Sequence, residues 1–275
     1  MTQVYDWQGE VGRKWARLHA LTDRAFTGLT QILLDRLARL PGEAILDIGC
    51  GAGELSLALS RQRPRARIVG VDVSADLVAA ALTRAEGRAN LSFTLADAAT
   101  WQPEDFTPDL LVSRHGVMFF PEPVVAFAHL REIAAPGAAL AFSCFRDRRL
   151  NPWASELTAL LPAHLAPVPD PVAPGPFAFA DEARIARILD DAGWKDLACE
   201  PVDFAYVVGM GDDPQADART FLGAIGPAAP ALTQLRGTAA GALLDKRIDE
   251  WLAGYCARGM VAMPAAAWIV TARRD

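Results

Sequence analysis

The sequence is poor in lysine and shows no basic segment. Only three of its 275 residues are lysine, at positions 14, 195 and 246, so arginines supply the other 24 basic side chains and are spread along the chain. The 33 acidic residues bring the net charge to −6. Because binding to the phosphate backbone requires a basic face, no nucleic-acid partner is expected.

Paired cysteines and long apolar runs are also missing, and no leader segment is expected. The longest weakly polar stretch, 133–145, is interrupted by a proline and a glycine, so no membrane span is expected. The first fifteen residues contain no basic segment followed by an apolar block, which predicts a cytoplasmic protein. Neither a disulfide framework nor a zinc site is expected, because no Cys-x-x-Cys pair occurs among Cys50, Cys144, Cys199 and Cys256.

The chain has instead an alternation of short apolar strands and helices, and with 52% hydrophobic residues it can bury a large core. Strands are predicted at 44–48, 67–73, 91–96, 110–113, 138–145, 202–208 and 266–271, with helices at 54–62, 75–86 and 123–135. Strand, helix and strand in succession form βαβ units. The pattern therefore predicts an α/β fold: a Rossmann-like, doubly wound, mostly parallel seven-stranded sheet with helical cap insertions.

The remaining segments are predicted to cover this sheet. Residues 1–40 have apolar side chains at helical spacing and form an N-terminal helical cap, whereas 41–275 form the Rossmann-like domain. Residues 146–180 combine a helix with a proline-rich loop, which is typical of a lid. Residues 214–257 are expected to form two helices around Gly226-Pro227 as a helical insert.

A glycine-rich loop follows the first predicted strand. In the segment Ile45-Leu-Asp-Ile-Gly-Cys-Gly-Ala-Gly-Glu54, glycines at 49, 51 and 53 allow a tight turn and close approach of a ligand to the backbone. A nicotinamide-binding loop requires glycine or alanine where Glu54 stands, and a phosphate loop requires a lysine. Asp47 beside the glycines also suits a cationic ligand better than a pyrophosphate.

Two further acids follow the next strands at 25-residue intervals. Asp72 ends the second predicted strand and Asp97 follows the third. Ligands of such sheets bind over the carboxyl ends of the strands, so these two acids and Asp47 are expected to converge there. A carboxylate after the second strand can accept hydrogen bonds from both ribose hydroxyls, and one after the third can accept from an adenine amino group. A ligand with an α-amino group, a ribose and an adenine would satisfy all three.

In these motifs the chain resembles the class I S-adenosylmethionine-dependent methyltransferases, on LDIGCGAG (46–53), VDVS (71–74) and LADA (95–98). WQGEVGRKW (7–15), SRHGVMFF (113–120), FRDRRLNPW (145–153) and PFAFAD (176–181) are similar to the branch that acts in ubiquinone and menaquinone biosynthesis. The resemblance implies S-adenosylmethionine as cofactor and S-adenosylhomocysteine as product.

The resemblance also implies roles for individual residues. Asp47 would lie near the aminoacyl end of the cofactor, Asp72 would bind the ribose, and Val73 would cover the adenine face. Further contacts are implied for Gly49, Cys50 and Gly51 through their backbones, for Asp97 and Ala98 at the adenine edge, and for Arg114 in the pocket wall.

Methyl transfer needs alignment, exclusion of water and sometimes removal of a proton. His115, directly after the fourth predicted strand, is the candidate base, and packing against neighbouring phenylalanines is the alternative. Trp15 either closes over the cofactor or packs in the core. The other three histidines lie in helical stretches, where packing or surface roles are expected. No carboxylates stand at the end of the fourth strand, so no metal is predicted.

The sequence thus predicts transfer of a methyl group from S-adenosylmethionine to an oxygen or carbon of a small molecule. The acceptor is expected to be largely apolar or aromatic, because Val117–Pro121, Trp153, Phe177 and Phe179 surround the crevice. An RNA or protein methyltransferase, a non-catalytic cofactor-binding protein and a nicotinamide oxidoreductase are the alternatives. A homodimer is one assembly that the sequence allows.

Overall fold

A computed structural model describes residues 4–168, 170–226 and 228–275. Its centre is one sheet in the order β3-β2-β1-β4-β5-β8-β6, with a short β7 paired to β8. The first five strands in this order are parallel. They are β1 (Ala44–Ile48), β2 (Arg67–Asp72), β3 (Leu91–Leu95), β4 (Leu110–Arg114) and β5 (Ala139–Phe145). The predicted α/β fold with a mostly parallel sheet is confirmed.

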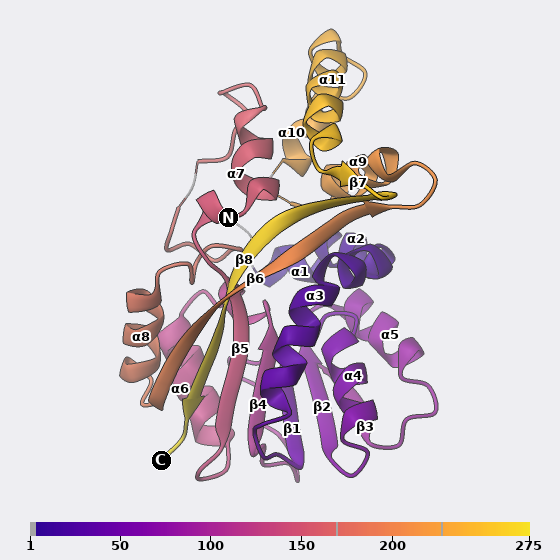
Figure 1. Ribbon diagram of the computed structural model, residues 1–275. Helices are drawn as coiled ribbons and strands as arrows, with labels where there is room; N and C mark the ends of the chain where they lie inside the picture. Colours follow the sequence, from indigo (N-terminus) through magenta and orange to yellow (C-terminus); the bar gives the residue numbers. More distant parts are fainter. Residues whose placement is uncertain (1–3, 169, 227) are drawn as a thin grey trace.

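An antiparallel ribbon completes the sheet. It consists of β6 (Lys195–Met210), β7 (Cys256–Ala257) and β8 (Met260–Arg273). Figure 1 shows β6 and β8 running together past the upper ends of the parallel strands. Both strands are much longer than the predicted 202–208 and 266–271. In β6 the apolar pattern covers only the buried half, whereas pairing with β8 continues through exposed residues to Lys195. In β8 buried apolar residues continue at every second position back to Val261, which the predicted 266–271 does not include.

Three helices flank the parallel strands, with boundaries close to prediction. They are α4 (Glu54–Gln62), α5 (Ala75–Arg84) and α6 (Pro123–Ile133). A further helix, α8 (Glu182–Asp191), packs against α6 and β6. Side chains cap two of these four helices: Ser74 Oγ accepts from the Leu77 amide at 3.4 Å, and an Asp181 carboxylate oxygen accepts from the Ala183 amide at 2.8 Å. Such caps satisfy amides that have no partner within the helix, which sets where each helix begins.

The N-terminal region is helical, as predicted, and forms α1 (Val4–Gln8), α2 (Glu10–Arg17) and α3 (His19–Leu37); residues 1–3 lie outside the described residues. Helix α3 packs along β6. The described residues of 214–257 form three helices rather than the predicted two, namely α9 (Pro214–Ala224), α10 (Ala229–Leu235) and α11 (Ala239–Ala253). The Gly237-Thr238 turn separates the last two, with Gly237 at φ 76° and Thr238 capping α11. Pro227, in the predicted break, lies outside the described residues.

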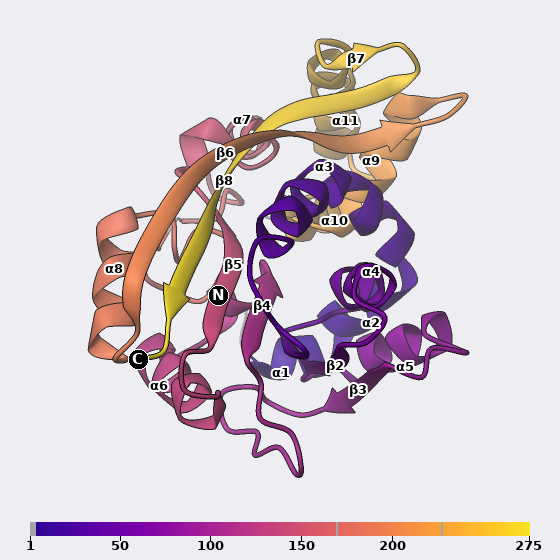
Figure 2. The ribbon, with the colours of Figure 1, turned by 60° about the horizontal axis from the view of Figure 1, so that its bottom comes forward.

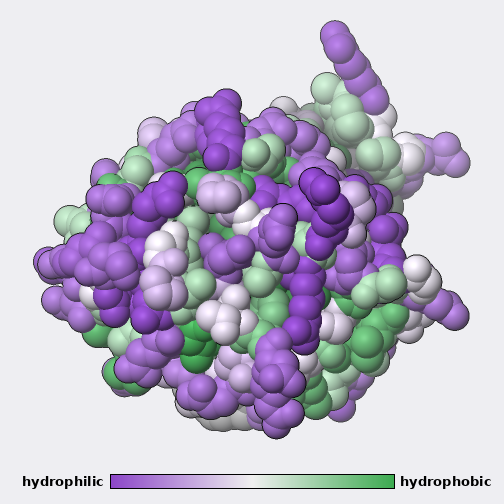
Figure 3. Space-filling model, turned by 90° about the horizontal axis from the view of Figure 1, so that it is seen from below, coloured by the Kyte–Doolittle hydropathy of each residue, from purple (hydrophilic) through white to green (hydrophobic). Residues whose placement is uncertain are grey.

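Within 146–180, the predicted helix is α7 (Pro152–Ala159), which ends shortly before Pro162 because a proline cannot continue the helical hydrogen bonds. Residue 169 of the proline-rich loop is not described. Figures 1 and 2 both place α9 to α11 at the far end of the β6–β8 ribbon, away from α6 and α8. Figure 3 shows the face seen from below as mostly hydrophilic, with small apolar areas between charged side chains. No described helix is long and apolar enough to cross a membrane.

Candidate functional site

A cavity lies at the carboxyl ends of β1, β2, β3 and β4. Its floor consists of the loop after β1 (47–52), the end of β2 (71–73), Asp97 and Ala98 after β3, and 114–116 at and after the end of β4. Helices α1, α2 and α3 supply one wall, and residues 145, 153, 206 and 225 supply another. This position agrees with the rule that ligands of open α/β sheets bind beyond the carboxyl ends of the strands.

The glycine loop has the conformation that its sequence predicts. Gly49 and Gly51 have φ angles of 62° and 55°, which residues other than glycine rarely adopt. A Cβ on Gly49 would lie 2.9 Å from the Gly116 Cα, so this glycine also permits close packing of two loops. A Cβ on Gly51 would meet no described atom within 4 Å. The loop therefore leaves open space beside its backbone, as a close-fitting ligand requires.

Asp47 is a buried acid at the end of β1, only 1% exposed. The Ser56 hydroxyl donates a 2.5 Å hydrogen bond to its carboxylate. Burial raises the pKa of Asp47 to about 7, although the Ser56 hydrogen bond and the nearby Arg114 charge oppose this shift. A cationic group of a ligand in the cavity would stabilise the ionised carboxylate.

The other two acids also organise the backbone. Asp72 accepts hydrogen bonds from the Gly51 amide at 2.8 Å and from the Ser74 amide at 2.9 Å, so it joins the glycine loop to the start of α5. Burial nevertheless raises the pKa of Asp72 above its ordinary value. Asp97 accepts from the Ala99 amide at 2.9 Å. Each carboxylate oxygen has two lone pairs, so these contacts leave acceptor capacity for a ligand.

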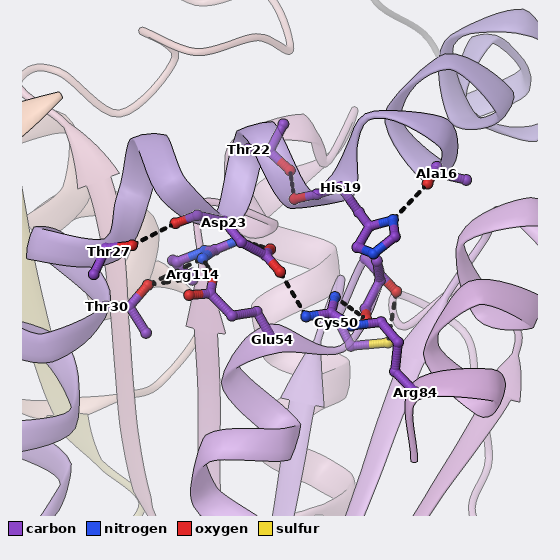
Figure 4. A network of polar contacts seen from close by, with 12 residues as sticks. Ala16, His19, Thr22, Asp23, Thr27, Thr30, Cys50, Glu54, Arg84 and Arg114 are labelled. Atoms are coloured by element: carbon purple, nitrogen blue, oxygen red, sulfur yellow. Dashed lines mark hydrogen bonds and ion pairs between the residues drawn. The ribbon is translucent and has the colours of Figure 1, made fainter. Parts of the chain in front are cut away.

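Arg114, the last residue of β4, is held in a polar network at the cavity wall (Figure 4). Its guanidinium forms an ion pair with Glu54, donates to Thr30 Oγ1 at 3.0 Å, and lies 4.0 Å from a carboxylate oxygen of Asp23. Asp23 in turn pairs with Arg84 at 2.5 Å. Glu54, which argued against a nicotinamide loop, thus balances the charge of Arg114.

His115 lies directly after β4 and is 8% exposed. Its φ of 62° is uncommon for a residue with a side chain. Its Nδ1 lies 2.7 Å from Ser143 Oγ, whereas its Nε2 is buried without a polar partner among the described residues. Burial and the Arg114 charge hold the pKa of His115 well below its ordinary value, so the imidazole is uncharged at neutral pH.

His115 lies at one end of a cluster of aromatic rings that we call the aromatic box: Phe26 and Phe145, which contact His115, and Trp153 and Tyr206, which pack against these two rings. The His115 ring centroid is 5.2 Å from that of Phe26 and 4.2 Å from that of Phe145. Trp153 lies 5.0 Å from Phe145 and 5.6 Å from Tyr206. The indole Nε1 of Trp153 is buried without a partner among the described residues.

The structure brings all eleven predicted site residues to this one cavity: Trp15, Asp47, Gly49, Cys50, Gly51, Asp72, Val73, Asp97, Ala98, Arg114 and His115. Their individual roles stay predictions. Trp15 contacts Trp7 edge-on at 5.3 Å between ring centroids while also bordering the cavity, so both of its predicted roles remain open. Of the predicted apolar residues, Trp153 and 118–120 border the cavity. Phe177 stacks on Trp153, and Phe179 packs in the core.

The sequence pattern does not indicate a site role for four further residues that border the cavity: Asp23, Phe26, Phe145 and Tyr206. His19, expected to be a packing or surface residue, borders it as well. Asp23 and Phe26 lie within a helix whose pattern indicates only an amphipathic element. Tyr206 lies in the predicted strand 202–208, but its side chain reaches the cavity only because β6 extends past the parallel strands. Among the described residues no cluster of three or more His, Cys, Asp or Glu side chains could hold a metal.

Residues 45–137 match a family described as "Methyltransferase domain". A trans-aconitate 2-methyltransferase of Variovorax paradoxus is 30% identical over 227 residues, which are 80% of this chain and 78% of that protein. The chain therefore belongs to the class I S-adenosylmethionine-dependent methyltransferases. Its cofactor is S-adenosylmethionine. The cavity fits this cofactor, because open space beside Gly51 adjoins acids that can bind an amine, a ribose and an adenine.

Two other methyltransferases extend the comparison. A trans-aconitate 2-methyltransferase of Methylobacterium radiotolerans is 31% identical over 173 residues, which are 61% of this chain but only 62% of that protein. Phosphoethanolamine N-methyltransferase 2 of Haemonchus contortus, solved with S-adenosyl-L-methionine, has a TM-score of 0.58 at 17% identity and covers all of this chain and 61% of its own. The latter likeness shows the fold alone. These relatives do not show the similarity to the quinone-biosynthesis branch.

Proposed function

We propose that this protein transfers the methyl group of S-adenosylmethionine to an oxygen or carbon of a small, largely apolar or aromatic molecule. The observation that supports this acceptor class is the aromatic box, which lines the same cavity as the glycine loop and the three acids. Aromatic walls with a few polar groups are typical of small-molecule sites. An acceptor that packs against the aromatic box would lie beside the cofactor.

The residues of the floor would hold the cofactor. Asp47 would bind its α-amino group, Asp72 its ribose, and Val73 would cover its adenine. The remaining contacts would come from Trp15, Gly49, Cys50, Gly51, Asp97, Ala98 and Arg114. The sulfonium supplies an activated methyl group, so the protein's part is to align the acceptor and exclude water.

Water would be excluded by the N-terminal helices (1–40), the lid (146–180) and the helical insert (214–257). Hydrogen bonds between the lid and the helical insert support a common role for these two segments in covering the cavity. The Glu156 carboxylate of α7 accepts from Trp251 Nε1 at 2.7 Å and from the Tyr255 hydroxyl at 2.8 Å, both at the α11 end of the insert. Trp153 of α7 and Ile225 of the insert both border the cavity. The cytoplasmic location and the homodimer stay predictions from the sequence.

Charge in the cavity favours a largely apolar acceptor with at most one negative charge over a tricarboxylate such as the one named for the relatives. Among its described lining residues Arg114 is the only arginine or lysine, and Glu54 already neutralises it. A tricarboxylate would therefore bring three negative charges into a site with three acids on its floor, where the sulfonium of the cofactor balances only one. The net charge of −6 likewise disfavours an RNA substrate.

Calorimetric titration with S-adenosylmethionine, S-adenosylhomocysteine and NADH tests the cofactor site. We expect micromolar binding of the first two and none of the third; binding of NADH alone would refute the proposal. An acceptor screen that detects S-adenosylhomocysteine would then compare phenols, quinols and aromatic acids with trans-aconitate. Turnover of an aromatic acceptor would support the proposed class, and turnover of trans-aconitate alone would contradict it. Cofactor binding without turnover of any acceptor would favour the non-catalytic alternative.

A further inference from the structure

Ser143 is a buried hydroxyl that the cofactor site does not use. It lies on β5 with no exposed surface, and its Oγ is 2.7 Å from His115 Nδ1. The backbone joins the same two residues, because the His115 amide donates to the Ser143 carbonyl at 3.1 Å. No other hydrogen bond of the Ser143 hydroxyl occurs among the described residues.

The direction of this hydrogen bond follows from the groups that each alternative leaves unpaired. If Nδ1–H donated to Ser143 Oγ, the hydroxyl hydrogen and the Nε2 lone pair would both be buried without partners. If the hydroxyl donates to Nδ1, only the Nε2 hydrogen lacks a partner. A buried unpaired polar group is costly, so the second arrangement is favoured. His115, which borders the cavity, then has an N–H group, and not a basic lone pair, at its buried Nε2.

The ring of His115 has little freedom to turn away from this arrangement. Its backbone is in the left-handed region, and rings of Phe26 and Phe145 flank it. Trp153 adds a second buried N–H without a partner in the same aromatic box. The unpaired polar groups of His115 and Trp153, two residues that border the cavity, are thus donors, which fit an electron-rich oxygen.

We propose that Ser143 is a positioning residue that holds His115 as the Nε2–H tautomer, and that His115 donates this hydrogen to an acceptor oxygen that enters the cavity already deprotonated. This inference rests on the proposed function and narrows its acceptors to small oxyanions, either aromatic carboxylates or acidic phenols. A lone pair of the oxygen forms the new O–CH₃ bond, and the S–CH₃ bond breaks with its electrons remaining on sulfur. No proton moves, so His115 acts as a donor and not as a base.

Nitrogen-15 NMR of the histidine rings in the full-length protein tests the tautomer without any acceptor. The wild-type His115 signal, assigned by its loss in H115Q, is expected to show the proton on Nε2, both with and without S-adenosylhomocysteine. In Ser143→Ala the signal should move toward a mixture of tautomers, and Ser143→Thr should restore it. A wild-type proton on Nδ1 would refute the inference, whereas failure of S-adenosylhomocysteine to bind would refute the proposed function instead.

Kinetics with benzoate and 4-nitrophenol as probes separate a donor from a base. Glutamine can donate from nearly the same position but cannot act as a base, so kcat of His115→Gln should exceed that of His115→Ala at least tenfold. Ser143→Ala should lower kcat about tenfold at unchanged Kd for S-adenosylhomocysteine. Ser60→Ala removes another buried hydroxyl, one outside the cavity lining, and serves as the control. Equal kcat for the two His115 variants, or turnover of phenol in preference to both probes, would contradict the proposal.

Discussion

The ionisation of the buried Asp47 carboxyl affects the stability of the folded protein as well as the proposed binding of the cofactor. Its pKa in the folded protein is about 7, above that of the unfolded chain, because the carboxyl is buried. The folded state therefore retains a proton that the unfolded state has lost. The stability that Asp47 contributes is complete below about pH 4 and declines as the pH rises to about 7.

Replacing Asp47 by asparagine removes this penalty. We expect the Tm of ligand-free Asp47→Asn to exceed that of the wild type by about 5 °C at pH 8, with no comparable difference at pH 4. The rise of the Asp47 pKa from its ordinary value to about 7 corresponds to about 4 kcal/mol, which is the upper limit of the stability that Asp47→Asn can gain. Thermal unfolding of both proteins between pH 4 and 8 measures it. A difference that does not change with pH would show that the carboxyl is ionised throughout.

Asp72 has a structural and a proposed binding role, which two variants can separate. Asp72→Ala should weaken cofactor binding about 10–100-fold, following the free energy of charge-assisted hydrogen bonds. It also removes the hydrogen bonds from Gly51 and Ser74, so its Tm should fall. Asp109→Ala is the matched control, because Asp109 accepts from the Glu43 and Ala44 amides at the opposite end of the sheet. Calorimetry that finds unchanged affinity in Asp72→Ala would refute the ribose assignment.

At the scale of elements, helix α2 is held against α5 by close packing at Gly12. A Cβ there would lie 2.1 Å from the Trp7 carbonyl oxygen and 2.2 Å from Ser74 Oγ. Gly12→Ala should therefore displace α2 and weaken binding of S-adenosylhomocysteine about tenfold. Gly28→Ala in α3 is the control, because its Cβ would meet its nearest neighbour at an ordinary 3.6 Å. Equal affinity in the two variants would mean that α2 does not cover the cofactor.

The boundaries of helices and strands with a clear local sequence pattern could be predicted closely. The boundaries of strands that depend on pairing with another strand could not. Strand β1 and helix α4 have the predicted boundaries, since an apolar run, three glycines and an amphipathic pattern follow one another there. Strand β6 begins at Lys195, seven residues before the predicted start. Its first half has no buried face, and β8 beside it supplies the hydrogen bonds. The third helix of 214–257 begins at a turn that the apolar pattern does not mark.

For the whole molecule, cofactor binding should raise the melting temperature of the protein. A ligand at 100 times its Kd stabilises the folded state by about 2.7 kcal/mol, or about 5–10 °C in Tm for a chain of this size. We expect this shift with S-adenosylhomocysteine and not with NADH, and we expect Asp109→Ala to retain it. Differential scanning fluorimetry measures the Tm shift of the wild type with each ligand and that of Asp109→Ala with S-adenosylhomocysteine. A shift with NADH of equal size would argue for a general nucleotide site.

The sequence by itself determined the parallel sheet, the glycine loop and the position of the three acids. Each of these depends on a strand and the few residues that follow it, so neighbouring positions in the chain contain the whole signal. Only the tertiary structure decided that Phe26 and Phe145 flank His115, that Trp153 and Tyr206 complete the aromatic box, and that Ser143 Oγ lies within hydrogen-bond distance of the imidazole. These side chains come from two helices and two strands far apart in the chain, and their meeting depends on how α3, α7 and the β6–β8 ribbon pack over the sheet. No local pattern encodes such a contact, and for that reason the sequence located the glycine loop and the acids of the cavity but only part of its aromatic lining.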